Sequence, residues 1–341
     1  MGDAYTALAD GPHTLFYNPA LLARHKFFSF YAINPTIDVS NILGDSDRFS
    51  DISSDPVEAA DTFMNFPVHM GINMTPSVKM GNFGLTAIYN YQTNMLLQND
   101  TTPMFTIDHH FDKGFIAGYA FPIYGKYKTG EGGEHLALGF SVKYLSREGI
   151  NNTFNLTSTT FLNALSAGEV DDILTSLGQV KGTGWGIDLG VDHVTSMGSG
   201  QTLFTSLAIL DPYTKLHTED NVNDFEVQSQ PMQVNLGMAY NIDFGALLDV
   251  TFSTDVKNIH QAKQANGYGE DIKLGVDIGN PLLRVLAGYN AGYYSYGAQV
   301  NLGFVDMYAG FYDTEVGEKA GQIKARRAVI YFSILDFEFE P

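Results

Sequence analysis

Hydrophobic and polar residues alternate with a period of two along short segments that recur across almost the whole chain. In residues 136–144, Leu, Phe, Val and Tyr occupy every second position, with Ala, Gly, Ser and Lys between them. Residues 185–191, 234–240 and 272–278 repeat this pattern. Because successive side chains of a strand point to opposite faces, each segment has one apolar and one small or polar face. A soluble β-sandwich shares this pattern, but a transmembrane barrel turns the apolar face to lipid and the polar face to a wet lumen.

The alternation predicts fourteen strands after residue 25. Most of them reach the roughly 9–11 residues that a barrel strand needs to cross a bilayer, and a single-chain bacterial barrel has an even number of strands. We therefore expect an all-β fold, a 14-stranded antiparallel transmembrane β-barrel. The predicted strands are 26–39, 67–76, 81–96, 105–121, 134–147, 183–194, 201–210, 232–241, 245–256, 270–278, 282–290, 292–302, 304–312 and 325–339.

The gaps between these segments sort by length, as in outer-membrane barrels with long external loops and short periplasmic turns. Two junctions depart from the sorting: 122–133 is long where a turn is expected, and the junction near Ala291 is short where a loop is expected. The sorting predicts which end of the barrel faces outward. The long gaps, 40–66, 148–182, 211–231, 257–269 and 313–324, are expected outside, and the short gaps, 77–80, 195–200, 242–244, 279–281 and the Gly303 junction, on the periplasmic side.

Residues 1–25 are the least strand-like part of the chain. Gly11-Pro12 and Asn18-Pro19 interrupt regular structure there. We expect a plug-like segment over 1–25 with about one helical turn, and a barrel over 26–341. This segment lacks the basic start and apolar core of a signal peptide, so we expect a mature or trimmed form of an exported protein.

Two of the long gaps carry helical patterns. In 157–178, apolar residues such as Phe161 and Leu165 recur at spacings of three and four, and 55–64 is a weaker helix start. The stronger helix either packs on the barrel mouth or forms an apolar access groove or partner-docking surface.

Composition narrows the class further. Charged residues make up 17% of the chain, against roughly 25% for an average soluble domain, and aromatic residues make up 13%. Apolar runs of 18 or more residues are absent, which excludes a helical membrane span. The net charge of −19 disfavours nucleic acid as a partner, since phosphate binding needs basic patches.

Several acids share the inward phase of their strands. In lipid each would cost several kcal/mol, so we interpret them as the lining of a wet lumen, or as a cation-preferring or plug-anchoring wall. Aromatic residues, including Trp185 and Tyr144, suit the girdles at the two membrane interfaces. The inward acids are Asp188, Asp192, Asp249, Asp277 and Asp306.

The sequence offers no catalytic or metal-binding set. His109 and His110 are neighbours on a predicted strand, so they face opposite sides and cannot readily share a metal ion. The chain has no Cys, phosphate-binding glycine loop or serine nucleophile motif. We expect neither an enzyme nor a cofactor.

The N-terminal segment carries a motif in two halves. The first is Ala7-Leu8-Ala9-Asp10, and the second is Tyr17-Asn18-Pro19-Ala20 followed by Leu21. The two halves at this spacing resemble the start of the FadL-like outer-membrane superfamily, which includes fatty acid and hydrocarbon channels and the related PorV-type and TraF-like barrels. The last strand also resembles the assembly signal of outer-membrane barrels, since it ends in aromatics at Phe337 and Phe339.

The resemblance implies a fourteen-stranded barrel plugged from the periplasmic side. In the transporter branch a hydrophobic ligand binds near the external loops and leaves sideways into the bilayer, once the plug moves and a strand kink opens. Asn18, Pro19 and Ala20 would form the plug motif, mainly in structural roles. The residues that would line a ligand path are Leu15, Phe16, Leu21, Leu22, Phe161 and Leu165.

Two functions remain open from the sequence. The first is a passive channel for hydrophobic small molecules in the bacterial outer membrane, with outer-membrane lipid around the barrel. The second is a non-transporting subunit of a secretion, motility or surface-attachment complex, with envelope proteins as partners. A channel should have an apolar tunnel, whereas a platform should have a sealed lumen and a large apolar patch outside the bilayer band.

Overall fold

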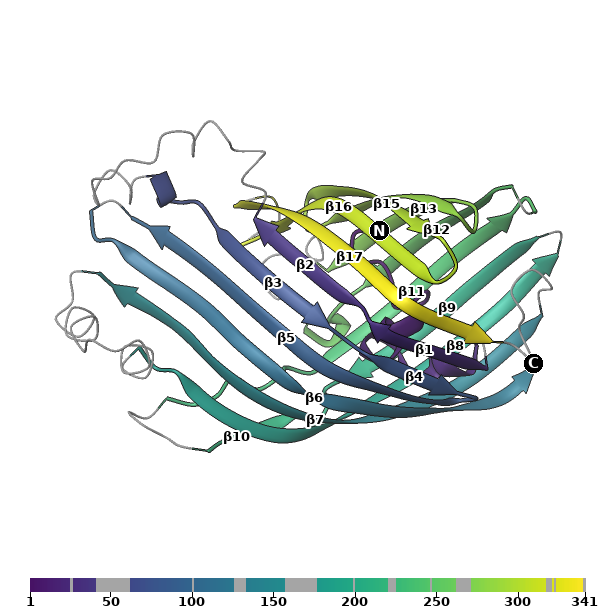
Figure 1. Ribbon diagram of the computed structural model, residues 1–341, viewed down its shortest axis with the longest axis horizontal. Helices are drawn as coiled ribbons and strands as arrows, with labels where there is room; N and C mark the ends of the chain where they lie inside the picture. Colours follow the sequence, from purple (N-terminus) through teal and green to yellow (C-terminus); the bar gives the residue numbers. More distant parts are fainter. Residues whose placement is uncertain are drawn as a thin grey trace.

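The computed structural model contains a single antiparallel sheet rolled into a barrel (Figure 1). It describes residues 1–24, 27–40, 62–99, 101–125, 133–156, 177–198, 200–219, 225–245, 247–261, 271–316, 321 and 323–339. The strands are β1 (Phe28–Ile33), β2 (Pro35–Ser40), β3 (Val68–Met74), β4 (Ser77–Met80), β5 (Phe83–Gln98), β6 (Met104–Gly125), β7 (Glu134–Asn155), β8 (Val180–Gly198), β9 (Gln201–Leu210), β10 (Lys215–Thr218), β11 (Gln233–Asp243), β12 (Asp249–Val256), β13 (Ile272–Gly279), β14 (Leu283–Asn290), β15 (Tyr293–Asn301), β16 (Val305–Glu315) and β17 (Lys324–Phe339).

These elements form fourteen wall strands. β1 and β2 are two parts of one strand interrupted at Asn34, and β3 and β4 are two parts of the next, interrupted at Thr75 and Pro76. β10 continues β9 along the same edge of β8 after residues 211–214. The last strand, β17, pairs with both β1 and β2 and closes the cylinder, so the predicted 14-stranded barrel is confirmed.

The apolar face of the wall points outward. Leu138, Phe140, Ile187 and Leu236 are 44%, 42%, 42% and 41% exposed, although a sandwich would bury them between two sheets. Their neighbours Gly139, Ser141, Asp188 and Gly237 face the interior. An apolar outside and a small or polar inside identify a barrel whose solvent is lipid.

The wall is much taller on one side than on the other. β6 and β7 have 22 residues each, whereas β12, β13 and β14 have 8 each. At about 3.3 Å per residue, the short strands are about 26 Å long, close to the roughly 25 Å apolar band of an outer-membrane barrel, and the long ones extend well beyond it. Figure 1 shows β5–β7 projecting past the opposite wall on the left.

The end of the long strands is called the external end below, because the gap lengths predict that it faces outward. The short turns after β4, β8, β11, β13 and β15 all lie at the opposite end, with the start of β1 and the end of β17. On the outer surface of the long side, the Trp185 ring lies 5.1 Å from the Tyr144 ring and 6.0 Å from the Phe115 ring. This outward aromatic cluster includes Trp185 and Tyr144, two of the residues expected in the aromatic girdles at the membrane interfaces.

Several predicted boundaries are wrong, among them those of three gaps. The turn predicted at 77–80 is strand β4, and the chain turns at Gly81, whose φ of +59° suits glycine. The loop predicted at 211–231 contains β10, because β8 extends past β9 and leaves an edge on which residues 215–218 pair. The loop predicted at 148–182 starts too early and ends too late, since β7 reaches Asn155 and β8 begins at Val180.

Other predicted segments lie wholly or mostly outside the described residues. They include the helix at 157–178, with Phe161 and Leu165, and the helix start at 55–64. Most of the loops 40–66 and 257–269 lie there as well.

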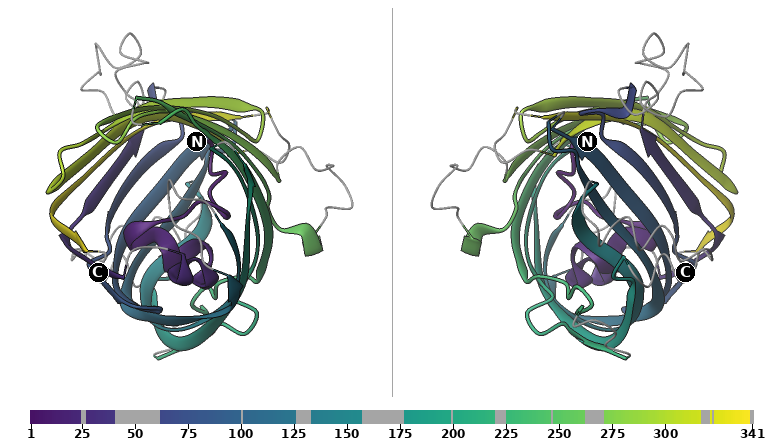
Figure 2. Two further views of the ribbon diagram at one scale, coloured as in Figure 1. Left: turned by 90° about the vertical axis from the view of Figure 1, so that its right-hand side faces the viewer. Right: turned by 90° about the vertical axis from the view of Figure 1, so that its left-hand side faces the viewer.

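Residues 1–24, called the N-terminal segment below, lie inside the barrel toward the β6–β8 wall (Figure 2). They form the short helices η1 (Gly11–His13), α1 (Thr14–Tyr17) and η2 (Pro19–Ala23), and a further short helix, η4 (Ile259–Gln261), follows β12. Pro12 and Pro19 stand in the first turns of η1 and η2, where their missing N–H is not needed. Among the described residues no helix is long and apolar enough to cross a membrane.

Candidate functional site

Asn18 anchors the N-terminal segment to the wall. Its extended backbone (φ −163°) places it as the N-cap of η2, where Oδ1 accepts a hydrogen bond from Ala20 N at 3.0 Å. Its Nδ2 donates to Val191 O of β8 at 3.0 Å. Asn18, Pro19 and Ala20 are all buried. The motif that the sequence singled out therefore fixes the backbone of the segment against the barrel.

Seven glycines of the wall receive the N-terminal segment. A Cβ at Gly139 would lie 2.1 Å from Ala20 N, and one at Gly190 would lie 1.9 Å from Asn18 Oδ1. The segment thus lies so close to the wall that any residue larger than glycine at these positions would overlap it. We call this set the glycine belt; it consists of Gly84, Gly118, Gly139, Gly190, Gly237, Gly275 and Gly288.

Part of the interior is a dry core rather than a wet lumen. Leu15 and Leu22 of the N-terminal segment belong to one cluster of buried side chains with inward residues of the wall. Phe16 and Phe225 pack against its edge. The cluster replaces the expected water on this side of the barrel, because the segment and the wall both present apolar groups there. Its other members are Ile88, Ile116, Ala120, Leu145, Val180, Leu216 and Val227.

A second segment enters the interior from the external end. Residues 225–229 follow β10 and are held by hydrogen bonds from Arg147 Nη1 to Gln228 O at 2.9 Å and from Val227 N to Thr218 Oγ1 at 3.1 Å. Arg147 is itself fixed by a double hydrogen bond to Asp112 at 2.7 and 2.8 Å. A Cβ at Gly182 would lie 2.4 Å from Val227 Cγ1, so the glycine makes room for this valine.

Charged groups tie the N-terminal segment to β12. Asp255 Oδ2 accepts hydrogen bonds from Tyr5 N at 3.0 Å and Thr6 N at 2.8 Å. Lys257 Nζ lies 3.4 Å from Asp255 Oδ2 and 3.6 Å from Asp3 Oδ1. Asp3 also accepts a hydrogen bond from Tyr17 OH at 2.8 Å. Burial and the nearby Asp3 carboxylate raise the pKa of Tyr17, which keeps this phenol protonated as a donor.

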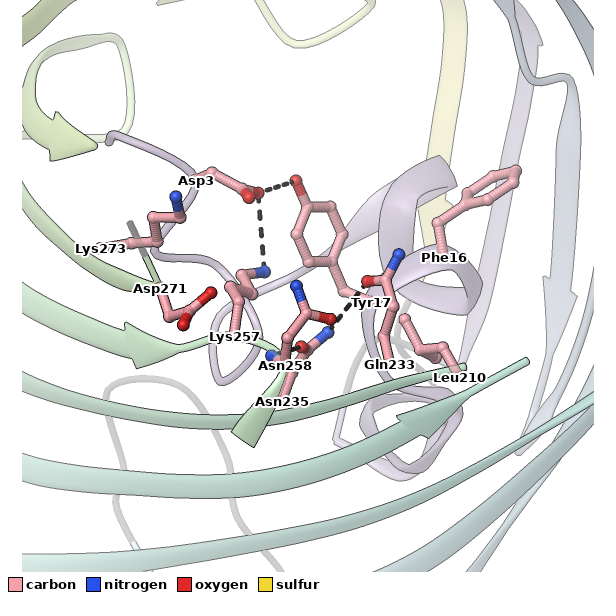
Figure 3. Close-up of a pocket in the computed structure, with 10 residues that line it drawn as sticks. All are labelled: Asp3, Phe16, Tyr17, Leu210, Gln233, Asn235, Lys257, Asn258, Asp271 and Lys273. Atoms are coloured by element: carbon pink, nitrogen blue, oxygen red, sulfur yellow. Dashed lines mark hydrogen bonds and ion pairs between the residues drawn. The ribbon is translucent and has the colours of Figure 1, made fainter. Parts of the chain in front are cut away.

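A cavity of about 470 Å³ lies between the N-terminal segment and the external ends of β11, β12 and β13 (Figure 3). Most of its wall is polar, and four of the polar residues, Asn235, Lys257, Asp271 and Lys273, are buried. Its apolar lining comes from an edge of the N-terminal segment and the end of β9. The lining residues are Asp3, Phe16, Tyr17, Leu210, Gln233, Asn235, Lys257, Asn258, Asp271 and Lys273.

The predicted lumen acids are largely paired. Asp188 is fully buried and accepts hydrogen bonds from Ser141 at 2.7 Å and Lys143 at 2.9 Å. Arg284 binds both Asp249 and Asp277. Asp188 is therefore not a solvated lining residue but half of a buried ion pair, as expected for a charge removed from water.

The two remaining predicted lumen acids, Asp192 and Asp306, differ in burial. Asp192 is fully buried, accepts a hydrogen bond from Ser206 at 2.7 Å, and lies 3.4 Å from Arg24 of the N-terminal segment. Asp306 is half-buried and accepts hydrogen bonds from Gln299. Only Asp192 of these two touches the N-terminal segment through an ion pair.

The residues predicted to line a ligand path fall in different places. Phe16 borders the cavity, whereas Leu15 and Leu22 lie in the apolar cluster and Leu21 is buried. Sequence reasoning missed most of the cavity's polar lining. The alternation at 272–278 places Lys273 on the inner face, but its position opposite Asp255 depends on strand register, which the sequence does not state.

The two adjacent histidines do face opposite sides of β6. His109 Nδ1 contacts Thr93 Oγ1 at 2.8 Å on one face, and His110 lies 3.8 Å from Asp108 and 3.9 Å from Asp112 on the other. Among the residues that the structure describes, no group of three or more His, Asp or Glu side chains is arranged to hold a metal ion.

Comparisons with known proteins give only distant likenesses. No family model matches the chain, and no curated protein matches it. Among solved structures, it is similar to the toluene transporter TodX of Pseudomonas putida, with 12% identity, a TM-score of 0.46 and coverage of 98% of this chain and 96% of that one. It is also similar to the toluene transporter TbuX of Ralstonia pickettii, with 11% identity, a TM-score of 0.42 and coverage of 95% and 94%.

A longer protein also appears among the similar structures. CdiB from Acinetobacter baumannii has 10% identity and a TM-score of 0.36, and the chain spans 60% of its length. TodX and TbuX are channels of the FadL family, whose N-terminal motif this chain's motif resembles.

Proposed function

We propose that the protein is an outer-membrane channel for small hydrophobic molecules, in which the N-terminal segment is a movable plug and release occurs sideways into the bilayer. The observation that carries this proposal is the apolar cluster inside the barrel. It joins residues 225–227 at the external end to Leu15 and Leu22 of the plug. An apolar ligand that displaces these contacts stays among apolar side chains along the way, so its transfer from water is favourable.

A weak point in the wall lies beside the plug. β1 pairs with β4, and β2 pairs with β3, but between these two ladders the strands are not paired at Asn34 and Thr75. The side chain of Asn34 bridges the break: Nδ2 donates to Thr75 O at 2.8 Å, and Oδ1 accepts from Thr75 N at 3.0 Å. One side chain thus replaces a stretch of ladder, and its rotation would unpair the wall there by breaking two hydrogen bonds instead of a whole ladder.

The plug touches the strands on both sides of this break. Helix η1 packs against β1 and β4, and Tyr31 of β1 lies against Gly11 of η1. The Tyr31 hydroxyl also donates to Glu338 of β17. Movement of η1 would therefore change the packing of the strand that carries Asn34, which couples plug displacement to lateral opening.

A disulfide across the break tests the proposal. The chain has no Cys, so the double variant Asn34→Cys/Thr75→Cys introduces only one pair. Uptake of a labelled aromatic hydrocarbon and of a labelled fatty acid is measured in cells that express each variant. We expect the oxidised pair to abolish uptake and dithiothreitol to restore it.

The matched control is Asn241→Cys/Thr251→Cys. These residues are direct register partners in an unbroken ladder, and their side chains hydrogen-bond at 2.8 Å. Oxidation of this pair should leave uptake unchanged. Uptake of neither probe by the wild type would refute the channel and favour a subunit of an envelope complex. Full uptake with the oxidised Asn34–Thr75 pair would refute lateral release.

A further inference from the structure

Three turns at the end of the barrel opposite the long strands carry large apolar side chains. They are residues 244–248, 280–282 and 302–304, called the apolar turns below, and they join β11 to β12, β13 to β14 and β15 to β16. Their sequences contain no charged residue. Exposed apolar groups gathered at one rim mark a surface that contacts something other than water. The side chains that are more than half exposed are Phe244, Leu247, Leu282, Leu302 and Phe304.

Turns on the long side of the wall have a different composition. Residues 126–133, between β6 and β7, include Lys126, Lys128 and Glu131, and the turn between β8 and β9 has the sequence Gly-Ser-Gly over 198–200. Charged residues and small polar residues suit a turn in water. The contrast between the two sides calls for a reason that depends on the height of the wall.

The short strands do not cross the apolar band of a membrane by themselves. The eight residues of β13 or β14 span about 26 Å along the strand at about 3.3 Å per residue. Strands of membrane barrels tilt by about 35–45°, so this length covers only about 19–22 Å of an apolar band that is about 25 Å tall. Part of the band must therefore lie against residues beyond the ends of these strands.

An ion pair limits the band at the external end of the short side. Asp313 of β16 shares the outward phase of Phe311 and lies 2.7 Å from Lys324 of β17, so the hydrocarbon ends before this pair. Phe304 is nine positions from Asp313, which is about 30 Å along the strand and about 21–24 Å along the membrane normal. Phe304 thus lies within the band even if the band begins at the ion pair.

The backbone of each apolar turn is hydrogen-bonded within the turn. In each case the side chain of an Asp or Asn accepts a hydrogen bond from the main-chain N–H two positions later. Hydrocarbon contains no water to satisfy a backbone group, so a turn placed there must satisfy its own. The pairs are Asp243 Oδ1 with Gly245 N at 2.6 Å, Asn280 Oδ1 with Leu282 N at 2.9 Å, and Asn301 Oδ1 with Gly303 N at 2.8 Å.

We infer that the apolar turns are immersed in the acyl chains of the adjacent membrane leaflet, so that phospholipid covers this rim of the barrel. The apolar turns continue the lipid-facing surface of the wall, which is too short on this side to fill the band. Burial of their side chains in hydrocarbon is favourable, since it removes apolar surface from water. This inference goes beyond the proposed function and does not depend on what the barrel transports.

Tryptophan emission tests the inference in a membrane without other proteins. The chain has one Trp, Trp185, so the Trp185→Phe background is free of Trp. Phe304→Trp and Leu282→Trp are each made in this background and reconstituted into phosphatidylcholine vesicles, with or without bromine on the acyl chains. Bromine quenches Trp on contact. We expect both reporters to lose emission in brominated vesicles as Trp185 of the wild type does, because Trp185 belongs to the lipid-facing aromatic cluster.

The matched control is Thr101→Trp in the same background. Thr101 is exposed in the turn between β5 and β6, and it lies fourteen positions beyond the girdle residue Phe115 on the external side. Brominated lipid should leave this control unchanged, whereas acrylamide in the water should quench it. Retention of the folded-barrel band on unheated gels verifies that each variant is folded.

The opposite result has a clear meaning. If the Phe304→Trp and Leu282→Trp reporters are unaffected by brominated lipid and are quenched by acrylamide as the control is, the apolar turns lie in water and the inference is overturned. A periplasmic protein would then be the better candidate for the group that covers them. Hydrocarbon uptake by the wild type is measured separately, so a failure of the channel proposal leaves these emission results unchanged.

Discussion

The seating of the N-terminal segment depends on the absence of a side chain at Gly139. A methyl group there would lie 2.1 Å from Ala20 N, 2.3 Å from Pro19 C and 2.5 Å from Ala20 Cα. All three atoms are backbone, so no rotamer change relieves the overlap. Since carbon atoms normally approach to about 3.5–4.0 Å, Gly139→Ala forces the segment back by about 1.5 Å or distorts β7.

The cost follows from overpacking. Added methyl groups in well-packed interiors typically cost about 1–3 kcal/mol. Here the shift also lengthens the hydrogen bond from Asn18 Nδ2 to Val191 O, now 3.0 Å. About 1.4 kcal/mol changes an equilibrium constant tenfold. The population of molecules in which the N-terminal segment has left the wall, called the unseated population, should therefore rise about 5- to 150-fold.

The rate of cleavage by trypsin after Arg24 measures this population. Arg24 is held by Asp192 at 3.4 Å and donates to Ala7 O at 2.7 Å, and its side chain is only 5% exposed, so trypsin cannot take up this side chain while the segment is seated. When opening is fast relative to cleavage, the cleavage rate follows the open population. We expect Gly139→Ala to be cut after Arg24 about 5- to 150-fold faster than the wild type, as followed by mass spectrometry.

The control is Gly71→Ala on β3. A Cβ there would meet His69 Nε2 at 3.3 Å and Asp38 Cβ at 3.5 Å, and nothing of the N-terminal segment. Its cleavage rate should stay within about twofold of the wild type. Equal rates for Gly139→Ala and the wild type, with the barrel folded, would show that the glycine belt does not control seating.

Three further outcomes are expected. In Gly182→Cys/Val227→Cys, oxidation should fix residues 225–229 to β8 and block uptake until dithiothreitol is added; unchanged uptake would exclude movement of these residues. Asn34→Ala leaves Thr75 N and O without the side-chain partner, and should lower the free energy of unfolding by about 1–3 kcal/mol in denaturant titrations, whereas an unchanged value would mean that the bridge is dispensable. Burial lowers the pKa of His13 to about 4. The unseated segment gains a proton below about pH 6.5 that the seated segment does not accept until about pH 4, so seating weakens as the pH falls through this range. The protection of residues 14–21 against hydrogen exchange, relative to the intrinsic exchange rate at each pH, should fall over that window in the wild type but not in His13→Gln.

The local pattern of the sequence was enough to predict the strands of the barrel wall. The alternation at 136–144 assigned Leu138 and Phe140 to the outside and Gly139 to the inside, because a strand has no other way to place neighbouring side chains. Gap lengths likewise predicted that the short turns share one end of the barrel, as they do in the structure. The errors arose where two strands interact: the edge that accepts β10 and the break at Asn34 depend on where neighbouring strands end and how they register, which a single segment does not encode.

The interior could be predicted only in part. The motif around Asn18 and Pro19 indicated a segment with its own local structure, and the short helices agree with that expectation. The glycines of the belt are spread over positions 84 to 288, and the sequence gives no sign that they form one surface. The buried state of Asp188 was also hidden, since its partners Ser141 and Lys143 lie more than 40 residues earlier on β7.

By itself, the sequence determined which segments are strands and which face of each strand is apolar, because period-two alternation is a local property that each strand expresses alone. Tertiary structure alone decided what fills the cylinder. The apolar cluster, the glycine belt and the charged cavity each join the N-terminal segment to strands far along the chain. Closure of the barrel fixes the register of all fourteen strands together, and only then do these distant residues face the same small space.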